Sequence, residues 1–176
     1  MSMFCYQCQE TAKGTGCVTR GVCGKTDDVA NLQDLLIYQL KGLSQIVVKA
    51  GLDVADLKEA NHELLNSLFM TITNANFDGE AFVAQIRKLE GIRDAVRASA
   101  GVSGLHDSAT FPVAGMDKEA MLAKAASVGV LSTENEDVRS LRELVIYGLK
   151  GMAAYTHHAL NIGKEKAEIY GFMYEA

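Results

Sequence analysis

The sequence lacks tryptophan, holds a single proline in 176 residues and has no cysteine after Cys23. One proline and a 48% share of hydrophobic residues exclude a disordered chain, because disordered chains bury too little apolar surface to fold. The sequence has no apolar run close to the ~20 residues that are needed to span a bilayer. It also shows no terminal hydrophobic segment of the kind that directs export. The net charge of −5 argues against a nucleic-acid partner. We therefore expect a cytoplasmic protein without a membrane or nucleic-acid partner.

All four cysteines lie within the first 23 residues, in the spacing Cys-x2-Cys-x8-Cys-x5-Cys. The Cys-x2-Cys pair lets two thiolates converge on one metal, and the glycines of this window let the loop fold back with the other two. Four soft sulfur ligands select zinc or iron–sulfur chemistry over hard cations. We therefore predict a metal site formed by Cys5, Cys8, Cys17 and Cys23.

Two disulfides and a structural zinc are the alternatives for this window. Disulfides would staple only a short loop, in a chain that has no signal peptide and is long enough to form its own core. Structural zinc usually has paired Cys-x2-Cys knuckles or a Cys/His mixture, whereas only Cys5 and Cys8 have that spacing here. The spacing favours an iron–sulfur cluster and leaves zinc open.

Positive groups near the cysteines would oppose the negative charge of a thiolate cluster. The backbone N–H groups of a helix that begins just after Cys23 would act in this way. Lys13, Arg20 and Lys25 could do the same, but basic loop residues are more often simply solvated. We expect these three side chains to be exposed.

The residues around the cysteines resemble a known family. MFCYQCQETAK at 3–13, TGC at 15–17, GVCGK at 21–25 and LQDLLIY at 32–38 are similar to the amino terminus of the hybrid cluster protein family, also called hydroxylamine reductase or prismane protein. LVIYGLKGMAAY at 144–155 also resembles this family. The compact cysteine spacing is similar to the branch, common in strict anaerobes, that binds a [4Fe–4S] cluster here. The resemblance thus implies a [4Fe–4S] cluster on the four cysteines.

The resemblance also implies an activity for the parent protein. Members of the family are oxidoreductases that reduce hydroxylamine to ammonia and water with two electrons, and they are linked to nitric oxide reduction. This chain would be their amino-terminal electron-transfer domain, supplied by a ferredoxin-like or reductase donor. The competing hypothesis is a non-enzymatic helical module with a structural zinc or a redox-idle four-cysteine site.

Family members are much longer, and their catalytic hybrid iron–sulfur–oxygen cluster is bound beyond the matched region. Because the four cysteines fill one site, no thiolate is left for that second cluster. We therefore expect the chain to be inactive alone and to need the missing carboxy-terminal catalytic domains.

After residue 26 the sequence predicts an all-α fold, because apolar residues repeat every three or four positions. Thr133 with Glu136 resembles a capping box for a long helix near the end. Other helix starts are expected at Thr26, Asp27 or Asp28, and at Asp53, Asp78 and Asp117. We divide the chain into a cysteine loop (1–26), a first helical bundle (27–100), a linker with the only proline (101–116) and a second, incomplete bundle (117–176).

An internal repeat supports two related units. Residues 141–152 match residues 32–43 at seven of twelve positions. Gly42 and Gly151 hold the same place in the repeat, where a missing side chain either lets another helix approach closely or is simply tolerated at the surface. Since the second unit is short of a helix, we expect self-association of the chain to cover its apolar face.

Overall fold

The computed structural model describes residues 2–176 and confirms the all-α prediction. In this range the only strand-like pairing is an isolated antiparallel bridge between Cys5 and Cys17. Short 3-10 turns lie at η1 (Ala12–Gly14), η2 (Val54–Asp56), η3 (Asp107–Ala109) and η4 (Val130–Ser132). The α-helices are α1 (Asp27–Ala50), α2 (Lys58–Met70), α3 (Gly79–Ala100), α4 (Lys118–Val128), α5 (Glu136–Asn161) and α6 (Ala167–Glu175).

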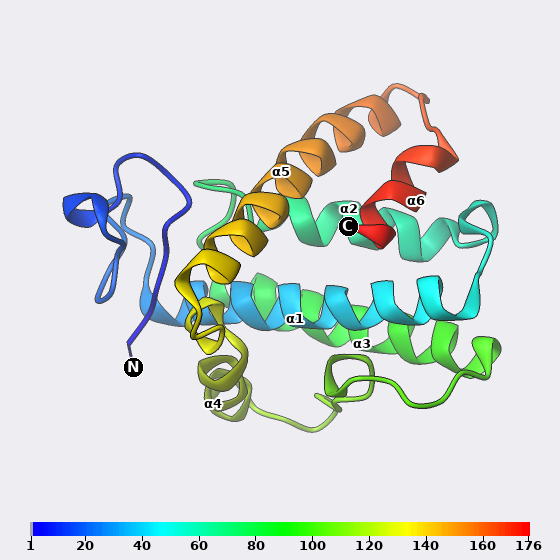
Figure 1. Cartoon of the computed structure of the whole chain (residues 1–176), viewed down its shortest axis with the longest axis horizontal. Coiled ribbons are helices and arrows are strands. Elements are labelled where there is room, and N and C mark those ends of the chain that lie inside the picture. Colours follow the sequence, from blue (N-terminus) through cyan, green and yellow to red (C-terminus); the bar gives the residue numbers. More distant parts are fainter. Residues whose placement is uncertain (1) are drawn as a thin grey trace.

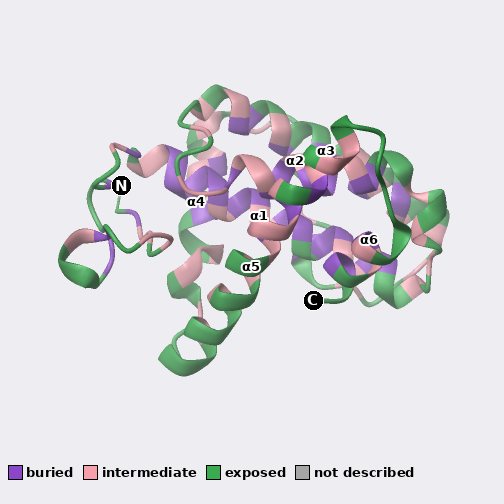
Figure 2. Cartoon of the chain, turned by 90° about the horizontal axis from the view of Figure 1, so that it is seen from above, coloured by how far each residue is buried: buried purple, intermediate pink, exposed green. Residues whose placement is uncertain are grey.

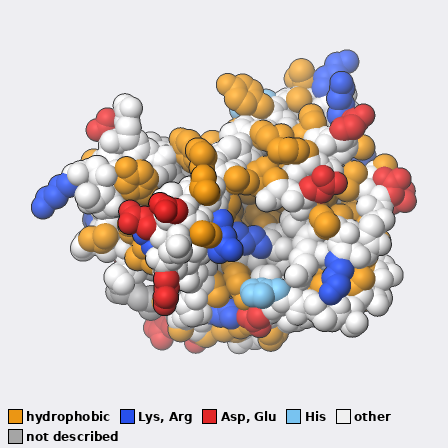
Figure 3. Space-filling model, viewed as in Figure 1, with side chains coloured by type: hydrophobic (Ala, Val, Ile, Leu, Met, Phe, Trp, Pro, Cys, Tyr) orange, Lys and Arg blue, Asp and Glu red, His pale blue; other side chains and the backbone are white. Residues whose placement is uncertain are grey.

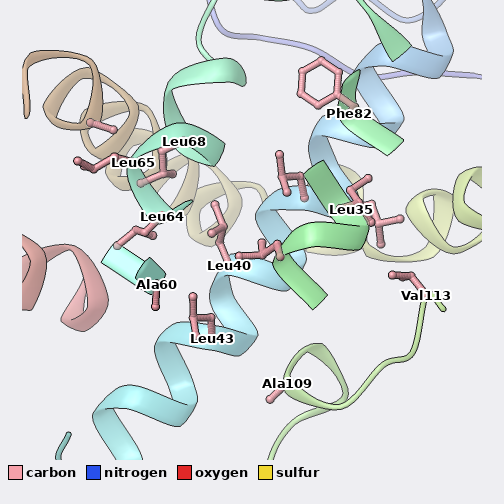
Figure 4. Packing of buried hydrophobic residues seen from close by; sticks show 14 of the residues in the cluster. Leu35, Leu40, Leu43, Ala60, Leu64, Leu65, Leu68, Phe82, Ala109 and Val113 are labelled. Atoms are coloured by element: carbon pink, nitrogen blue, oxygen red, sulfur yellow. The ribbon is translucent and has the colours of Figure 1, made fainter. Parts of the chain in front are cut away.

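Helix α1 is the centre of the molecule, and it contacts α3 most extensively (Figure 1). Its apolar stripe is fully buried, with Leu35 and Leu43 both 0% exposed. Figure 4 shows leucines of α1 lying between Leu64 of α2 and Phe82 of α3. Each such leucine contributes about 1.5–3 kcal/mol by leaving water. The core around α1 therefore forms a rigid support for the loop that precedes it.

Two of the predicted helix caps are confirmed in the structure. Asp78 accepts hydrogen bonds from the backbone N–H groups of Glu80 and Ala81, at the start of α3. Asp117 accepts from the N–H of Ala120, at the start of α4. Each carboxylate satisfies N–H groups that have no partner inside the helix.

Two other helix starts differ from the prediction, and the start of α1 agrees with it in position but not in its capping hydrogen bond. Asp53 caps the short turn η2, by accepting from the N–H of Ala55, and α2 begins only at Lys58. Thr26 precedes α1, but its hydroxyl donates to the Asp28 carboxylate instead of accepting from the backbone. The capping box at Thr133 is wrong, because Asn135 is the residue directly before α5 and accepts from the N–H of Val138.

Residues 101–116 contain no α-helix and pack closely against α1. A Cβ atom on Gly42 would lie 2.0 Å from Ser108 O, so a close approach at this glycine is confirmed, but the segment that approaches is the turn η3 and not the expected helix. Ala109 and Val113 of the same segment are 0% exposed and belong to the core around α1. A Cβ atom on Gly151 meets nothing within 4 Å. The division of the chain into two helical units stays a prediction.

Helix α5 packs against α2 and leaves much of its own surface exposed (Figure 2). Leu141 and Leu144 are 65% and 67% exposed, whereas Leu32 and Leu35, their equivalents in the repeat, are 0% exposed. Figure 3 shows hydrophobic side chains gathered over α5 on one face of the molecule. Among residues 2–176, no helix is both long and apolar enough to cross a membrane.

Candidate metal centre

The cysteine loop lies at one end of the molecule, next to the start of α1 (Figure 1). Two backbone hydrogen bonds pair its arms: Cys5 N–H donates to Cys17 O at 3.1 Å, and Cys17 N–H donates to Cys5 O at 2.9 Å. Met3 is 3% exposed and packs with Cys17 and with Ala30 of α1. The pairing brings two cysteines distant in the sequence together and anchors them to the helix.

Two glycines make the sharp turns of this loop possible. Gly16 has a φ of +126°, and a Cβ atom there would lie 2.6 Å from Cε2 of Phe4. Gly24 has a φ of +95°, just after Cys23. Other residues rarely adopt such positive φ angles, so both positions favour glycine. The prediction that glycines fold the loop back is confirmed at these two positions.

Cys17 is the most buried of the four cysteines, at 5% exposure, and its sulfur is surrounded by hydrogen-bond donors. The Ala12 N–H donates to Cys17 Sγ at 3.5 Å, and Thr11 Oγ1 lies 3.7 Å from the same sulfur. Burial alone would raise the pKa of the Cys17 thiol, but the N–H groups of Ala12 and Val22, the Thr11 hydroxyl and the charge of Lys25 together lower it. The loop therefore favours the thiolate, which is the form that binds metals.

Lys25 links the cysteine loop to α1 and is only 2% exposed. Its ammonium group donates to Gln33 Oε1 at 2.8 Å and lies 3.9 Å from Cys5 Sγ. The expectation that Lys25 is solvated is therefore wrong, whereas Lys13 and Arg20 are exposed as expected. In the turn that precedes α1, Gly21 N–H donates to Lys25 O, and the Lys25 side chain finds its partner, Gln33, inside the fold.

Lys150 of α5 also contacts the cysteine loop, and it is 4% exposed. Its ammonium group donates to Thr71 O at 3.3 Å. With the Gln7 amide oriented so that both of its ends find partners, Gln7 Oε1 accepts from Lys150 at 3.2 Å and Gln7 Nε2 donates to Thr71 O at 3.1 Å. Gln7 lies between Cys5 and Cys8, so Lys150 directly supports the Cys-x2-Cys segment.

The residues present fit an iron–sulfur cluster in chemical type and in surroundings. All four cysteines are free thiols, so no disulfide competes for them. The buried Gln33 Nε2 has no hydrogen-bond acceptor in the described part of the chain, although Gln33 is linked through Lys25 to Cys5. An unpaired buried donor of this kind suits an anionic group nearby. Across residues 2–176, no three Cys, His, Asp or Glu side chains already meet at one point, so the four-cysteine site stays a prediction.

A family profile described as "Prismane/CO dehydrogenase family" matches residues 3–176. The chain belongs to this family. Two curated relatives named hydroxylamine reductase each align with 100% of the chain: the protein of Acetivibrio thermocellus at 62% identity and that of Clostridium novyi at 54%. A third, from Parabacteroides distasonis, is 49% identical over 99% of the chain. The chain spans about a third of the length of these relatives, 32% or 33% in each case.

Two residues of this prismane-family site escaped the sequence analysis. Lys150 was not singled out, although it lies inside the stretch 144–155 that resembles the family and matches Lys41 in the repeat. Gln7 was quoted only as part of the motif around Cys5 and Cys8. Their pairing joins residues 143 positions apart, and no local pattern reports such a contact.

Proposed function

We propose that this chain is the amino-terminal electron-transfer part of a hydroxylamine reductase and that Cys5, Cys8, Cys17 and Cys23 hold a [4Fe–4S] cluster. The observation that carries the proposal is the paired Cys5 and Cys17 at the base of α1, with a buried ammonium beside Cys5. Whole-chain similarity to relatives named hydroxylamine reductase supports the assignment. When bound, the cluster would supply reversible one-electron transfer.

The residues of this chain position such a cluster and take no part in breaking bonds. The reaction of the whole protein would be NH2OH + 2 e− + 2 H+ → NH3 + H2O, and the N–O bond would break outside the residues described here. The cysteine loop would receive electrons one at a time and pass them toward that site. We propose that the chain is inactive alone, because it has no cysteine left for a second cluster.

The donor we propose is a ferredoxin-like or reductase protein that works in the cytoplasm. The cysteine loop stands at one end of the molecule, and Cys23 is exposed. Electron transfer between proteins requires the two centres to come close, which an exposed loop allows. The catalytic domains of the longer protein are the proposed acceptor.

The non-enzymatic alternative, a helical module with zinc or an idle cluster, is less well supported. It does not account for the match between the whole chain and hydroxylamine reductases. A redox titration followed by electron paramagnetic resonance distinguishes the two functions. After anaerobic reconstitution with iron and sulfide, a relay gives a signal that appears on reduction and disappears on reoxidation. A reconstituted chain without a reversible signal would overturn the relay proposal.

A further inference from the structure

Lys25 and Lys150 differ from every other buried charged side chain of residues 2–176. Five charged side chains are buried in this range. Three of them, Glu63, Glu90 and Arg93, have an ion-pair partner within 4.0 Å. For the two lysines, no carboxylate of the described residues lies within this distance. Burying a charge without a counter-ion costs free energy of folding. We therefore expect an anion close to these two unpaired ammonium groups.

The two lysines approach the cysteine loop from different elements. Lys25 lies beside the arm that carries Cys5, at 3.9 Å from its sulfur, and Lys150 is held by Gln7 on the Cys-x2-Cys segment. Since Gln7 lies between Cys5 and Cys8 in the sequence, both ammonium groups contact the segment that begins at Cys5 and ends at Cys8. The exposed Lys13 of the same loop is directed to solvent.

The charged groups that act on Lys150 include no carboxylate at ion-pair distance. Burial is the main cause that lowers the pKa of Lys150 to about 8, and the charge of Lys25 acts in the same direction, whereas Asp34, Glu143 and Cys5 act in the opposite direction. Both carboxylates act from beyond ion-pair distance. The neutral partners of the ammonium group, Thr71 O and the Gln7 amide, supply hydrogen bonds and no charge. No carboxylate that would balance the two lysines is therefore in contact with them, and the one sulfur in contact with Lys25 belongs to Cys5.

Four thiolates around a [4Fe–4S] core leave an oxidised cluster with about two negative charges, and one-electron reduction adds one more. A buried positive charge stabilises the more negative, reduced form. Its effect is large where solvent is excluded and small where water screens it. Burial of the two ammonium groups thus distinguishes them from the exposed basic residues of the loop.

We propose that Lys25 and Lys150 are internal counter-cations of the cluster held by Cys5, Cys8, Cys17 and Cys23, and that they raise its reduction potential. The proposal rests on the proposed function. It makes Lys150 the residue through which α5 acts on the electron-transfer site. Both lysines are positioning and tuning residues, since neither binds iron.

The test compares neutral and charged replacements in the reconstituted chain. Lys25→Met and Lys150→Met remove the charge at similar volume, Lys25→Arg and Lys150→Arg keep it, and Lys13→Met removes an exposed charge from the same loop. We expect each buried Met variant to change the one-electron equilibrium at least tenfold, which lowers the midpoint potential by about 59 mV or more. The Arg variants and Lys13→Met should stay near the unmodified chain. Far-ultraviolet circular dichroism checks that every variant is folded.

The outcomes separate this proposal from the function on which it rests. If the unmodified chain takes up no iron, the proposed function fails. If the cluster forms and is reducible, but both buried Met variants keep the potential of Lys13→Met, the counter-cation proposal alone fails. If a Met variant is folded but binds no cluster while the Arg variant at the same position binds one, the charge is required and the proposal holds. If neither variant at one position loads, the other lysine decides the test.

Discussion

The ammonium group of Lys25 lies 3.9 Å from Cys5 Sγ and 2.8 Å from Gln33 Oε1, so a buried positive charge joins the cysteine loop to the second turn of α1. This contact ties the candidate cluster to the central helix of the fold. The helical core does not include the cysteines, because Met3, Cys17 and Ala30 form a separate small cluster. Loss of the metal should therefore leave the helices in place.

Replacement of Cys17 with Ser tests this independence directly. The substitution removes the most buried thiol of the site, so we expect the [4Fe–4S] cluster to be lost or converted. The far-ultraviolet circular dichroism of the helices should stay almost unchanged, since their core does not use the loop. Iron analysis and circular dichroism on the same sample make the measurement. Loss of all helical signal would show that the bundle depends on the cluster.

The two repeat-related glycines should respond to alanine in opposite directions. In Gly42→Ala, the new Cβ atom would lie 2.0 Å from Ser108 O, and both the helix and the turn are packed. We expect a loss of about 1–3 kcal/mol in the free energy of unfolding. In Gly151→Ala, the Cβ atom enters open space within α5, and the better helix propensity should add about 0.5–1 kcal/mol. Urea unfolding of both variants makes the comparison, and equal effects would contradict the contact at Gly42.

The stability of the chain should depend on pH through Asp34. Burial is the main cause that raises the pKa of this carboxyl from 3.8 to about 7, and Glu143 acts in the same direction, whereas the Val130 N–H, Lys150 and Lys41 act in the opposite direction. Because the folded pKa lies above the unfolded one, this group lowers stability as the pH rises from about 4 to about 7. Asp34→Asn removes that loss and keeps an oxygen that accepts from Val130.

The Asn variant should therefore be more stable than the unmodified chain at pH 8, by on the order of 1 kcal/mol, and equally stable near pH 4. Thermal unfolding at both pH values measures the difference. A gain at pH 4 as large as the gain at pH 8 would show that titration of Asp34 is not its cause.

The exposed apolar face of α5 should make the 176-residue chain self-associate. Leu144 is 67% exposed on this face, although its repeat equivalent Leu35 is 0% exposed beneath the other helices. Leu144→Glu should shift the chain toward monomer in light scattering at high concentration. Phe77→Glu, which adds the same charge at a 44% exposed residue between α2 and α3, serves as the control. A clean monomer for the unmodified chain would count against self-association.

The sequence predicted most of the helices because their signals are local. Asp78 and Asp117 cap the expected helices, and the leucine stripe of α1 is buried as its period requires. Asp53 and Thr133 misled the prediction, since a capping residue is defined by its position relative to the first helical turn. Asp53 caps the η2 turn instead of α2, and Asn135 takes the capping position of α5 in place of Thr133.

Only the part of the candidate site that shows in the cysteine spacing could be predicted from the sequence. The four cysteines are visible as a pattern, but the burial of Lys25 depends on a turn whose geometry the sequence does not state. Lys150 reaches Gln7 only because α5 packs on α2 and places its ammonium group against Thr71. Long-range packing of this kind places the positive charges around the cysteines. No periodicity in the sequence predicts that packing.

The most direct test of the account is an anaerobic count of iron, sulfide and zinc on the purified chain, with its visible spectrum before and after dithionite. A [4Fe–4S] cluster on Cys5, Cys8, Cys17 and Cys23 predicts about four irons and four sulfides per chain and absorption that bleaches on reduction. Reconstitution with iron and sulfide precedes the count if oxygen has removed the metal. Bound zinc, or no iron after reconstitution, would contradict the account.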